Sequence, residues 1–317
     1  MSKVIRIGLI GVGKMGQNHL RVLSLLKGVE IAFIYDSNVE ATKKIAATYG
    51  VEATTDPYDK LDSVDAVVIA SPTSTHAEVV KKVGGKVKNI FVEKPLAATL
   101  SEAQELAEFA TAQRLNIQIG FIERFNPAVQ ATKRVLKRSD KVISIDFTRT
   151  NKLSSRITDV DVVTDLMIHD IDLAMYMNGP VKTVEAHGMT QGQMIDFASA
   201  LLTHTNGSFS RIQASRVTEK KMRMIQATCL EMFVDCDLLR KEINISRQSE
   251  ISQLAGEPYT IASLEESIEV RPQEALLSEL QVFVASCRGE SSEDKPGIQD
   301  GLNAMVVCDQ VQGAVLR

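Results

Sequence analysis

Three glycines near the amino terminus have the spacing of a dinucleotide-binding loop. They form G-x-G-x-x-G over 11–16, directly after an apolar run at 4–10 and before a segment of helical periodicity. In such a loop the first glycine permits a tight turn, the second lets a pyrophosphate approach the backbone, and the third lets the helix pack closely on the strand. The alternative is a glycine turn that binds no nucleotide. We expect the loop to bind a dinucleotide through Gly11, Val12, Gly13, Lys14, Met15 and Gly16.

An acidic residue follows the second predicted strand, 30–35. Asp36 lies twenty residues after Gly16, and no arginine follows it in Asp36-Ser37-Asn38. A carboxylate at this place can accept hydrogen bonds from ribose hydroxyls, and it repels a 2′-phosphate. The sequence therefore favours NAD over NADP.

Two further groups of ionisable residues could do chemistry. Lys94, in Glu93-Lys94-Pro95, follows a predicted strand at 89–92, and ligands bind at the carboxyl ends of parallel strands. Asp165, His169 and Asp172 are spaced i, i+4, i+7 on an otherwise apolar predicted helix at 160–177, so they share one face. The alternatives are a surface turn for the first group, and an internal ion pair that fixes the helix for the second. Asp170 lies one step off this face, and we expect it to support the site or an interface.

The elements that must position these residues change in character near residue 121. Before it, strands and helices alternate, which indicates an α/β Rossmann domain with a parallel sheet over 1–121. We expect strands at 4–10, 30–35, 65–70, 89–92 and 116–119, and helices at 15–27, 39–49, 74–83 and 101–115. Ser101 and Gln104 match a capping box at the start of the last of these helices.

The remainder, 122–317, predicts an α+β domain with an open, mostly antiparallel sheet. Polar and apolar residues alternate at 141–149 and in several runs between 181 and 246, while 127–138, 160–177, 272–288 and 298–316 have helical patterns. An alternative interpretation of the final helix, 298–316, is that it packs back on the first domain. We expect an exposed apolar sheet face that includes Ile225, Met232 and Phe233, covered in a homodimer or homotetramer.

Composition limits the class of protein. The 317 residues are 44% hydrophobic and 24% charged, with a net charge of −4, which is typical of a soluble globular protein and disfavours a nucleic-acid binder. The four cysteines have no metal-ligand spacing, so we expect reduced, mostly buried thiols and no metal site. Neither a targeting segment nor a membrane-spanning run of apolar residues is evident, so we expect a cytoplasmic protein without a membrane partner.

Together these segments resemble the glucose–fructose oxidoreductase / inositol dehydrogenase / rhizopine catabolism family. The resemblance covers nearly the whole chain and rests on 11–16, on Ser71-Pro72-Thr73-Ser74-Thr75-His76, on 93–95 and on 165–172. It implies an NAD(P)-dependent sugar or polyol oxidoreductase with an oligomeric second domain, and Asp36 favours NAD as the cofactor. Asp161 departs from the family pattern, because a glycine is expected in the turn before the helix. By resemblance, Ser71, Thr73, His76, Glu93 and Lys94 lie along the cofactor, and Lys94, Asp165 and His169 surround the reacting carbinol.

Within the family, 120–127 and 165–172 look most like members that oxidise the C3 hydroxyl of UDP-N-acetylglucosamine, so that an aminotransferase can install an amino group. This similarity implies a nucleotide-sugar substrate, bound by Lys94, Arg124, Asn126, Asp165 and His169. Alternatively, Arg124 forms an interdomain salt bridge. Asn126 could instead cap the helix that begins at Pro127. The competing functions are oxidation of another sugar or polyol, and a non-catalytic NAD-dependent sensor.

A mechanism follows from what alcohol oxidation requires. The carbinol must lose a hydride to the nicotinamide and a proton to a base with a pKa near neutrality. His169 suits the role of base, with Lys94 polarising the oxygen and Asp165 orienting either group. Lys94 is the alternative base if desolvation or a neighbouring cation lowers its pKa.

Overall fold

The computed structural model describes residues 3–152, 160–192, 194–252 and 260–317. Contacts divide the chain into two compact units, Met1–Phe125 with Glu274–Val306, and Asn126–Gln273 with Val307–Arg317. We call them the parallel-sheet unit and the antiparallel-sheet unit. The predicted division at 121/122 places 274–306 in the second domain, whereas these contacts group that segment with the first unit.

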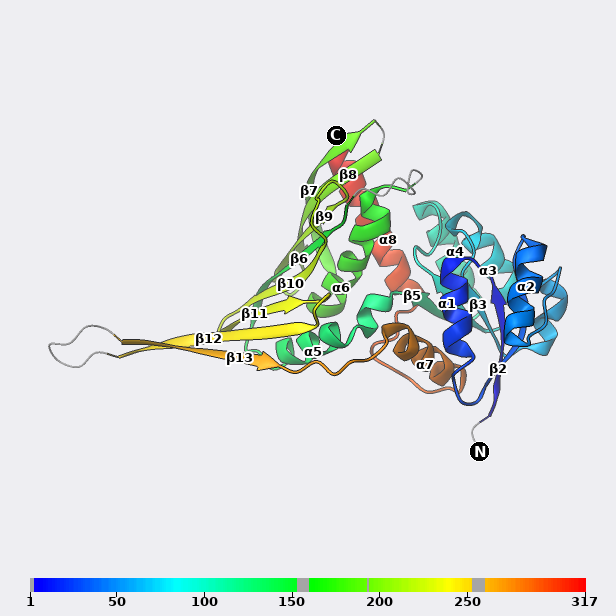
Figure 1. Cartoon of the computed structure of the whole chain (residues 1–317). Coiled ribbons are helices and arrows are strands. Elements are labelled where there is room, and N and C mark those ends of the chain that lie inside the picture. The colour runs from blue at the N-terminus through cyan, green and yellow to red at the C-terminus, as the bar shows by residue number, and fades with distance from the viewer. Residues whose placement is uncertain (1–2, 153–159, 193, 253–259) are drawn as a thin grey trace. The chain divides into compact units, whose positions relative to one another are not determined.

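Five parallel strands form the sheet of the first unit, in the order β2-β1-β3-β4-β5 (Figure 1). The central strands are almost entirely apolar and buried, because helices cover both faces of such a sheet. This confirms the predicted Rossmann architecture. The strands are β1 (Ile5–Ile10), β2 (Val29–Tyr35), β3 (Ala66–Ile69), β4 (Asn89–Glu93) and β5 (Asn116–Gly120).

The helices of this unit connect the strands and begin at or close to the predicted residues, and the predicted cap of the fourth helix is wrong. Thr99, not Ser101, caps the fourth helix, and it forms a reciprocal capping box with Glu102 rather than Gln104. The elements are α1 (Lys14–Leu23), α2 (Val39–Tyr49), α3 (His76–Gly84) and α4 (Leu100–Ala112), with short helical turns η1 (Tyr58–Ser63), η2 (Thr73–Thr75) and η3 (Ile122–Phe125).

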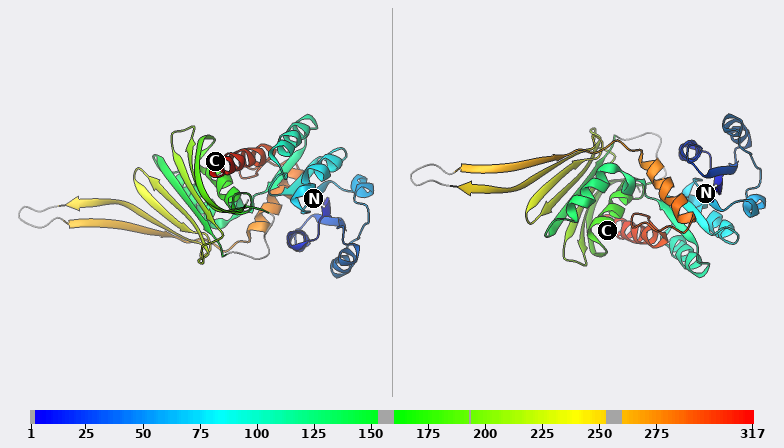
Figure 2. Two further views of the ribbon diagram at one scale, coloured as in Figure 1. Left: turned by 90° about the horizontal axis from the view of Figure 1, so that it is seen from above. Right: turned by 90° about the horizontal axis from the view of Figure 1, so that it is seen from below.

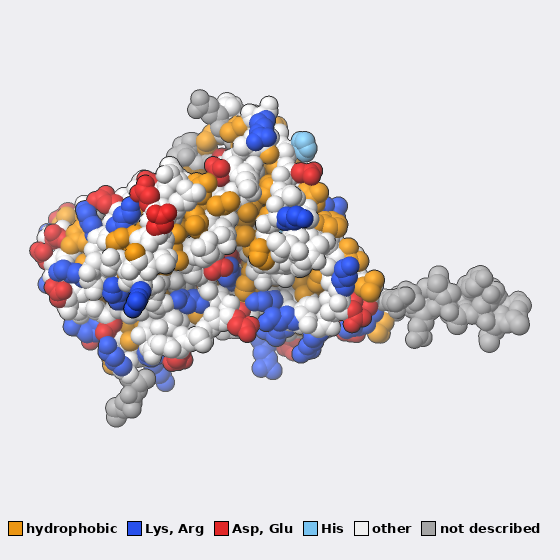
Figure 3. Space-filling model, turned by 180° about the vertical axis from the view of Figure 1, so that it is seen from behind, with side chains coloured by type: hydrophobic (Ala, Val, Ile, Leu, Met, Phe, Trp, Pro, Cys, Tyr) orange, Lys and Arg blue, Asp and Glu red, His pale blue; other side chains and the backbone are white. Residues whose placement is uncertain are grey.

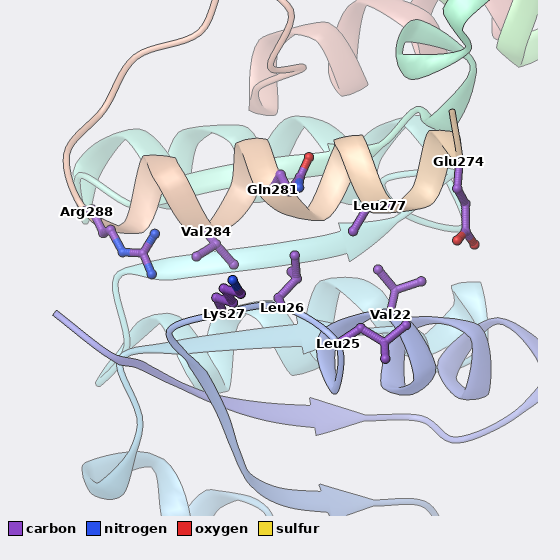
Figure 4. Close-up of a pocket in the computed structure, with 9 residues that line it drawn as sticks. All are labelled: Val22, Leu25, Leu26, Lys27, Glu274, Leu277, Gln281, Val284 and Arg288. Carbon is purple, nitrogen blue, oxygen red and sulfur yellow. The ribbon is translucent and has the colours of Figure 1, made fainter. Parts of the chain in front are cut away.

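Helix α7 (Ala275–Cys287) completes the core of the parallel-sheet unit. Phe283 packs edge-on against Phe91 of β4, with ring centroids 5.6 Å apart, and both rings are fully buried. Apolar contacts of this kind explain why the segment joins the first unit. Figure 4 shows the groove between α7 and the end of α1, where Leu26 and Val284 point toward each other. The last helix, α8 (Ile298–Val315), begins in this unit and ends in the other.

Eight strands form the sheet of the second unit, in the order β13-β12-β11-β10-β6-β9-β8-β7. Only the β6–β9 pair is parallel among the described strand pairs of this sheet, so the prediction of a mostly antiparallel sheet is confirmed. Strands β12 and β13 extend beyond their neighbours as a two-stranded ribbon (Figures 1 and 2). The strands are β6 (Val142–Thr150), β7 (Val181–Gln191), β8 (Met194–His204), β9 (Phe209–Ser215), β10 (Met222–Cys229), β11 (Met232–Asp237), β12 (Glu242–Ser252) and β13 (Thr260–Ile268).

Two helices pack on this sheet: α5 (Pro127–Leu136) against β11 and β12, and α6 (Ile168–Asn178) against β6 and β9. A π-helical turn, η4 (Val163–Met167), precedes α6. Asp161 caps the start of this segment, because its Oδ1 accepts a hydrogen bond from the Thr164 N–H at 2.9 Å. The residue that departs from the family pattern therefore satisfies a backbone donor at the helix start.

The prediction that Ile225, Met232 and Phe233 share one exposed apolar face of the sheet is wrong. Ile225 and Met232 are 0% and 6% exposed, whereas Phe233 is 39% exposed, because neighbouring residues on a strand point to opposite faces. The face that Phe233 shares is largely polar, and the register across it runs Arg211, Asp146, Gln226 and Asp235. The predicted homo-oligomer stays a prediction, without support from these three residues.

Other sequence expectations concern the surface and the cysteines. No helix in the described part of the chain is long and apolar enough to cross a membrane. Acidic and basic side chains are interspersed over the face drawn in Figure 3. Cys229, Cys236 and Cys308 are buried and Cys287 is half-buried. Burial raises the pKa of Cys236 to about 11 and that of Cys287 to about 12, which keeps these thiols protonated.

Candidate active site

The glycine loop after β1 has the backbone geometry that its spacing predicts. Gly11 has φ +94°, and a Cβ there would lie 2.5 Å from the backbone of Ala70 and Ser71. A Cβ on Gly16 would lie 1.9 Å from the Gly11 carbonyl oxygen, whereas one on Gly13 would meet no described atom within 4 Å. The first and third glycines are therefore required by packing. The second leaves the open approach to the backbone that a pyrophosphate needs.

Asp36 lies beside this loop at the end of β2. Its Oδ2 accepts a hydrogen bond from the Val12 N–H at 2.8 Å, and its Oδ1 accepts one from the Asn38 N–H at 3.0 Å. The Gly11 N–H donates to the Tyr35 carbonyl oxygen at 2.8 Å. These bonds fix the carboxylate next to the glycine loop, which is the position for contact with an adenosine ribose.

A pocket of 380 Å³ opens between the loops that follow β1 and β3. These strands are neighbours at the point where the strand order reverses, and open α/β sheets bind ligands there. Tyr58 and Lys82 had no motif to mark them, and only the fold brings them here, with the Lys82 Nζ 5.0 Å from the Tyr58 ring centre. The lining residues are Ile10, Gly11, Tyr35, Asp36, Ser37, Tyr58, Ser71, Pro72, Thr75, Glu78, Val79 and Lys82.

His76 connects the loop after β3 with the loop after β4. Its Nδ1 lies 2.9 Å from the Pro95 carbonyl oxygen, and its Nε2 lies 2.9 Å from the Ser71 carbonyl oxygen. Burial lowers the pKa of His76, and a neutral imidazole donates to only one of the two carbonyl groups. The structure thus places His76 as a link between two ligand-facing loops, and its predicted contact with the cofactor stays a prediction. Thr73 lies between Ser71 and His76 in the short turn η2.

Lys94 is half-buried at the carboxyl end of β4, and it is anchored by its neighbour. The Glu93 Oε2 accepts a hydrogen bond from the Lys94 N–H at 3.2 Å, while the Glu93 Oε1 lies 2.7 Å from the His19 Nε2. The Lys94–Pro95 peptide bond is cis. Both described contacts of the Glu93 carboxylate are internal, and its predicted contribution to cofactor binding stays a prediction. The sequence analysis did not identify His19 as part of this arrangement.

In the antiparallel-sheet unit, Asp165 and His169 are partly exposed on successive turns of the η4–α6 segment, whereas Asp172 is buried. The Asp165 Oδ2 lies 3.7 Å from the Arg216 Nη2. The predicted polar stripe is therefore divided between two accessible side chains and one buried side chain.

Asp170, which lies one step off the predicted polar face, makes a buried ion pair with Arg149. The Arg149 Nε and Nη2 donate to the two Asp170 carboxylate oxygens at 2.8 and 2.7 Å, and both side chains are buried. Because bidentate pairs fix geometry, this contact anchors α6 on β6 beside His169.

Arg124 and Asn126 both make structural contacts. The buried Arg124 donates to the Asp300 Oδ1 at 2.8 Å, and both residues belong to the parallel-sheet unit, so this pair is not the interdomain bridge considered above. The Asn126 side chain caps α5 by accepting from the Ala128 N–H at 3.1 Å. Their contacts with a substrate stay predictions.

The glycine loop, the acidic strand end and the pocket at the switch point define a dinucleotide-binding protein of the Rossmann class. Residues 5–121 match the model of the Gfo/Idh/MocA oxidoreductase family with an NAD-binding Rossmann fold, and residues 144–233 match the model of its C-terminal domain. The chain belongs to the Gfo/Idh/MocA family of oxidoreductases. The predicted family, enzyme class and NAD cofactor are confirmed.

Individual relatives act on sugars and polyols. A UDP-N-acetylglucosamine 3-dehydrogenase from Acidithiobacillus ferrooxidans is 29% identical over 288 residues, or 88% of each chain. A scyllo-inositol 2-dehydrogenase (NAD(+)) from Bacillus subtilis is 29% identical over 69% of each chain. The crystal structure of the Acidithiobacillus enzyme superposes with a TM-score of 0.87 over 98% of this chain and 97% of that one, at 27% identity. The chain is thus a member of a family of NAD-dependent sugar and polyol dehydrogenases.

Proposed function

We propose that this enzyme oxidises the C3 hydroxyl of UDP-N-acetylglucosamine to the 3-keto sugar, with reduction of NAD to NADH. The observation that carries this proposal is the similarity to the Acidithiobacillus enzyme, which extends over 88% of both chains and so includes both units. The segments 120–127 and 165–172, whose resemblance to such enzymes is noted above, support it. The 3-keto product is a suitable substrate for an aminotransferase, which we propose as the partner enzyme.

The residues of the parallel-sheet unit fit an NAD molecule. Asp36 is positioned to accept hydrogen bonds from the adenosine ribose, and Gly13 leaves room for the pyrophosphate at the start of α1. Tyr35 and Tyr58 line the pocket and offer apolar surface to the adenine. The bound cofactor supplies the hydride acceptor. Ser71, Thr73 and Lys94 follow the ends of neighbouring strands and complete the proposed cofactor contacts.

The proton of the hydroxyl requires a base. We assign this role to His169, whose partly exposed side chain lies on α6, one turn from Asp165. Lys94, as an ammonium ion, stabilises the negative charge that develops on the oxygen. The alcohol thus loses a hydride and a proton, and the products are a ketone, NADH and one proton. Lys94 belongs to the parallel-sheet unit and His169 to the antiparallel-sheet unit.

A second candidate function is oxidation of an inositol. One observation favours it: the Arg124 guanidinium, the candidate for a substrate phosphate, is buried and bonded to Asp300. An inositol 2-dehydrogenase from Rhizobium meliloti is also 25% identical over 96% of this chain. A substrate without phosphate does not need Arg124.

The experiment compares substrates directly. The enzyme is incubated with NAD and UDP-N-acetylglucosamine, myo-inositol or glucose, together with glutamate and an aminotransferase or another trap for ketones. The trap is required because oxidation of a secondary alcohol by NAD is unfavourable near neutral pH. The proposal predicts the 3-keto or 3-amino nucleotide sugar by mass spectrometry. Product from myo-inositol alone would establish the second candidate.

The predicted homodimer or homotetramer is tested separately. Light scattering at micromolar concentration should give two or four times the chain mass of 34.8 kDa. A mass equal to that of one chain would reject assembly.

A further inference from the structure

The core of the parallel-sheet unit holds three ionisable side chains that the proposed mechanism does not use. His19 comes from α1, Glu93 from β4 and Glu279 from α7. His19 and Glu279 are 0% exposed, and Glu93 is close to buried. Ionisable groups are rarely buried without a partner or a function, because burial disfavours the charged form.

Glu93 holds its two neighbours through different oxygen atoms. Its Oε1 accepts from the His19 Nε2 at 2.7 Å, and its Oε2 accepts from the Lys94 N–H at 3.2 Å. The His19 ring also packs edge-on against Phe91, with ring centres 5.0 Å apart. A carboxylate can accept from both donors at once, so the ionised form of Glu93 fits this geometry.

Glu279 is fully buried in the same unit, and its surroundings favour the neutral acid. Neither of its carboxyl oxygens has a hydrogen-bond partner among the described residues, although its backbone oxygen accepts from the Gln118 Nε2 at 3.1 Å. Burial, followed by the charge of Glu93, raises the pKa of Glu279 well above its usual value. The charged groups on other elements packed against α7 include Arg21 of α1, which is bonded to Glu274, and Glu123 and Arg124 of η3. The Arg124 guanidinium is bonded to Asp300.

We propose that His19 and Glu279 are positioning residues that act through Glu93 to fix the backbone of Lys94. This inference rests on the proposed role of Lys94 at the reacting oxygen. His19 orients the Glu93 carboxylate, which then holds the Lys94 N–H. Glu279 in its neutral form adds no second negative charge to the core that contains Glu93. Its ionisation would place two carboxylates together in the core, and Glu93 would then release the Lys94 backbone.

The kinetic test uses Glu279→Gln, which has the same shape and never ionises. The pH profile of kcat is measured with whichever sugar the wild type oxidises. We expect the variant to match the wild type near neutral pH and to keep its activity at alkaline pH, where the wild type loses it. Glu274→Gln, at the exposed start of the same helix, is the matched control and should follow the wild type. If kcat falls in the same way at alkaline pH in the wild type and in Glu279→Gln, the inference is overturned.

A second variant tests Glu93 itself. The amide in Glu93→Gln has one acceptor oxygen where the carboxylate has two, so it cannot reproduce the two hydrogen bonds that Glu93 accepts through separate oxygens from His19 and the Lys94 N–H. We expect kcat to fall roughly 10-fold or more because Lys94 is displaced, with little change in NAD affinity. Equal kcat for Glu93→Gln and wild type would reject the positioning role.

Thermal unfolding without substrate tests the state of Glu279 independently of turnover. Above the ordinary pKa of a glutamate, about 4.3, the carboxyl is ionised in the unfolded chain, while burial keeps it protonated in the folded one, so the wild type loses stability as the pH rises until the raised pKa is reached. The Tm of Glu279→Gln relative to wild type should therefore increase over this range. A constant difference would contradict a buried neutral acid. Failure of the proposed function appears differently, as an absence of oxidised UDP-N-acetylglucosamine from the wild type.

Discussion

The Asp36 carboxylate accepts a hydrogen bond from the Val12 N–H at 2.8 Å, and so connects the end of β2 to the glycine loop after β1. The same carboxylate also accepts from the Asn38 N–H. One side chain thus shapes the phosphate-binding loop and presents negative charge where an adenosine ribose is expected. The proposed contact of Asp36 with the ribose would therefore couple cofactor choice to the geometry of the loop.

Replacing Asp36 should change cofactor preference. Asp36→Ala combined with Ser37→Arg removes the charge that repels a 2′-phosphate and supplies a cation that binds it. We expect kcat/KM to shift from NAD toward NADP, with some loss of efficiency because the loop loses the Val12 contact. Steady-state kinetics with both cofactors measures this. A wild type that uses NADP as well as NAD would refute the argument from Asp36.

The catalytic assignment predicts large effects on turnover with small effects on cofactor binding. Lys94→Met and His169→Ala should each lower kcat by roughly 10²-fold or more, since acid–base or oxyanion support is lost. The exposed residues Lys43 and His187 provide matched controls through Lys43→Met and His187→Ala, which should keep kcat. Near-normal kcat in His169→Ala would remove His169 from the mechanism.

The buried pair of Arg149 and Asp170 should be sensitive to loss of one partner. Arg149→Met leaves the Asp170 carboxylate buried without this partner, and the expected loss is about 3–5 kcal/mol in the free energy of unfolding. The double variant Arg149→Met with Asp170→Leu should be less destabilised than the single one, because neither charge remains. Urea denaturation of the three proteins measures this. A double variant less stable than Arg149→Met would contradict the explanation.

Acid should destabilise the enzyme in part through His76. Burial lowers its pKa, so below about pH 6.5 the unfolded chain binds a proton that the folded chain does not, and stability falls as the pH falls. His204 is shifted in the same direction by burial. The variant His76→Gln should therefore lose less stability than wild type between neutral and acidic pH, as followed by thermal unfolding. Parallel curves would show that His76 does not contribute.

Local patterns in the sequence predicted the elements well where one signal dominated. The apolar runs of β1 and β3 and the glycines at 11–16 allow one interpretation, because few other folds bury such strands on both faces. The prediction of the capping box was wrong because Thr99-x-x-Glu102 and Ser101-x-x-Gln104 both match the pattern, and only the structure distinguishes them.

Contacts between distant segments were outside the reach of sequence patterns. Tyr58 and Lys82 join the pocket through the fold alone, and no motif marks either residue. The contact between His19 and Glu93 joins residues 74 positions apart. The helix pattern at 272–288 predicted α7, but not that its Phe283 packs against Phe91 of the first unit.

The most direct test of the proposed function follows the hydride itself. UDP-N-acetylglucosamine that carries deuterium at C3 is incubated with the enzyme, NAD and a ketone trap, and the NADH is examined by mass spectrometry. Substrate labelled at C4 is the control. The proposal predicts deuterated NADH from the C3-labelled sugar and unlabelled NADH from the control. Deuterated NADH from the C4-labelled sugar, or NADH formation from inositol but not from UDP-N-acetylglucosamine, would contradict oxidation at C3.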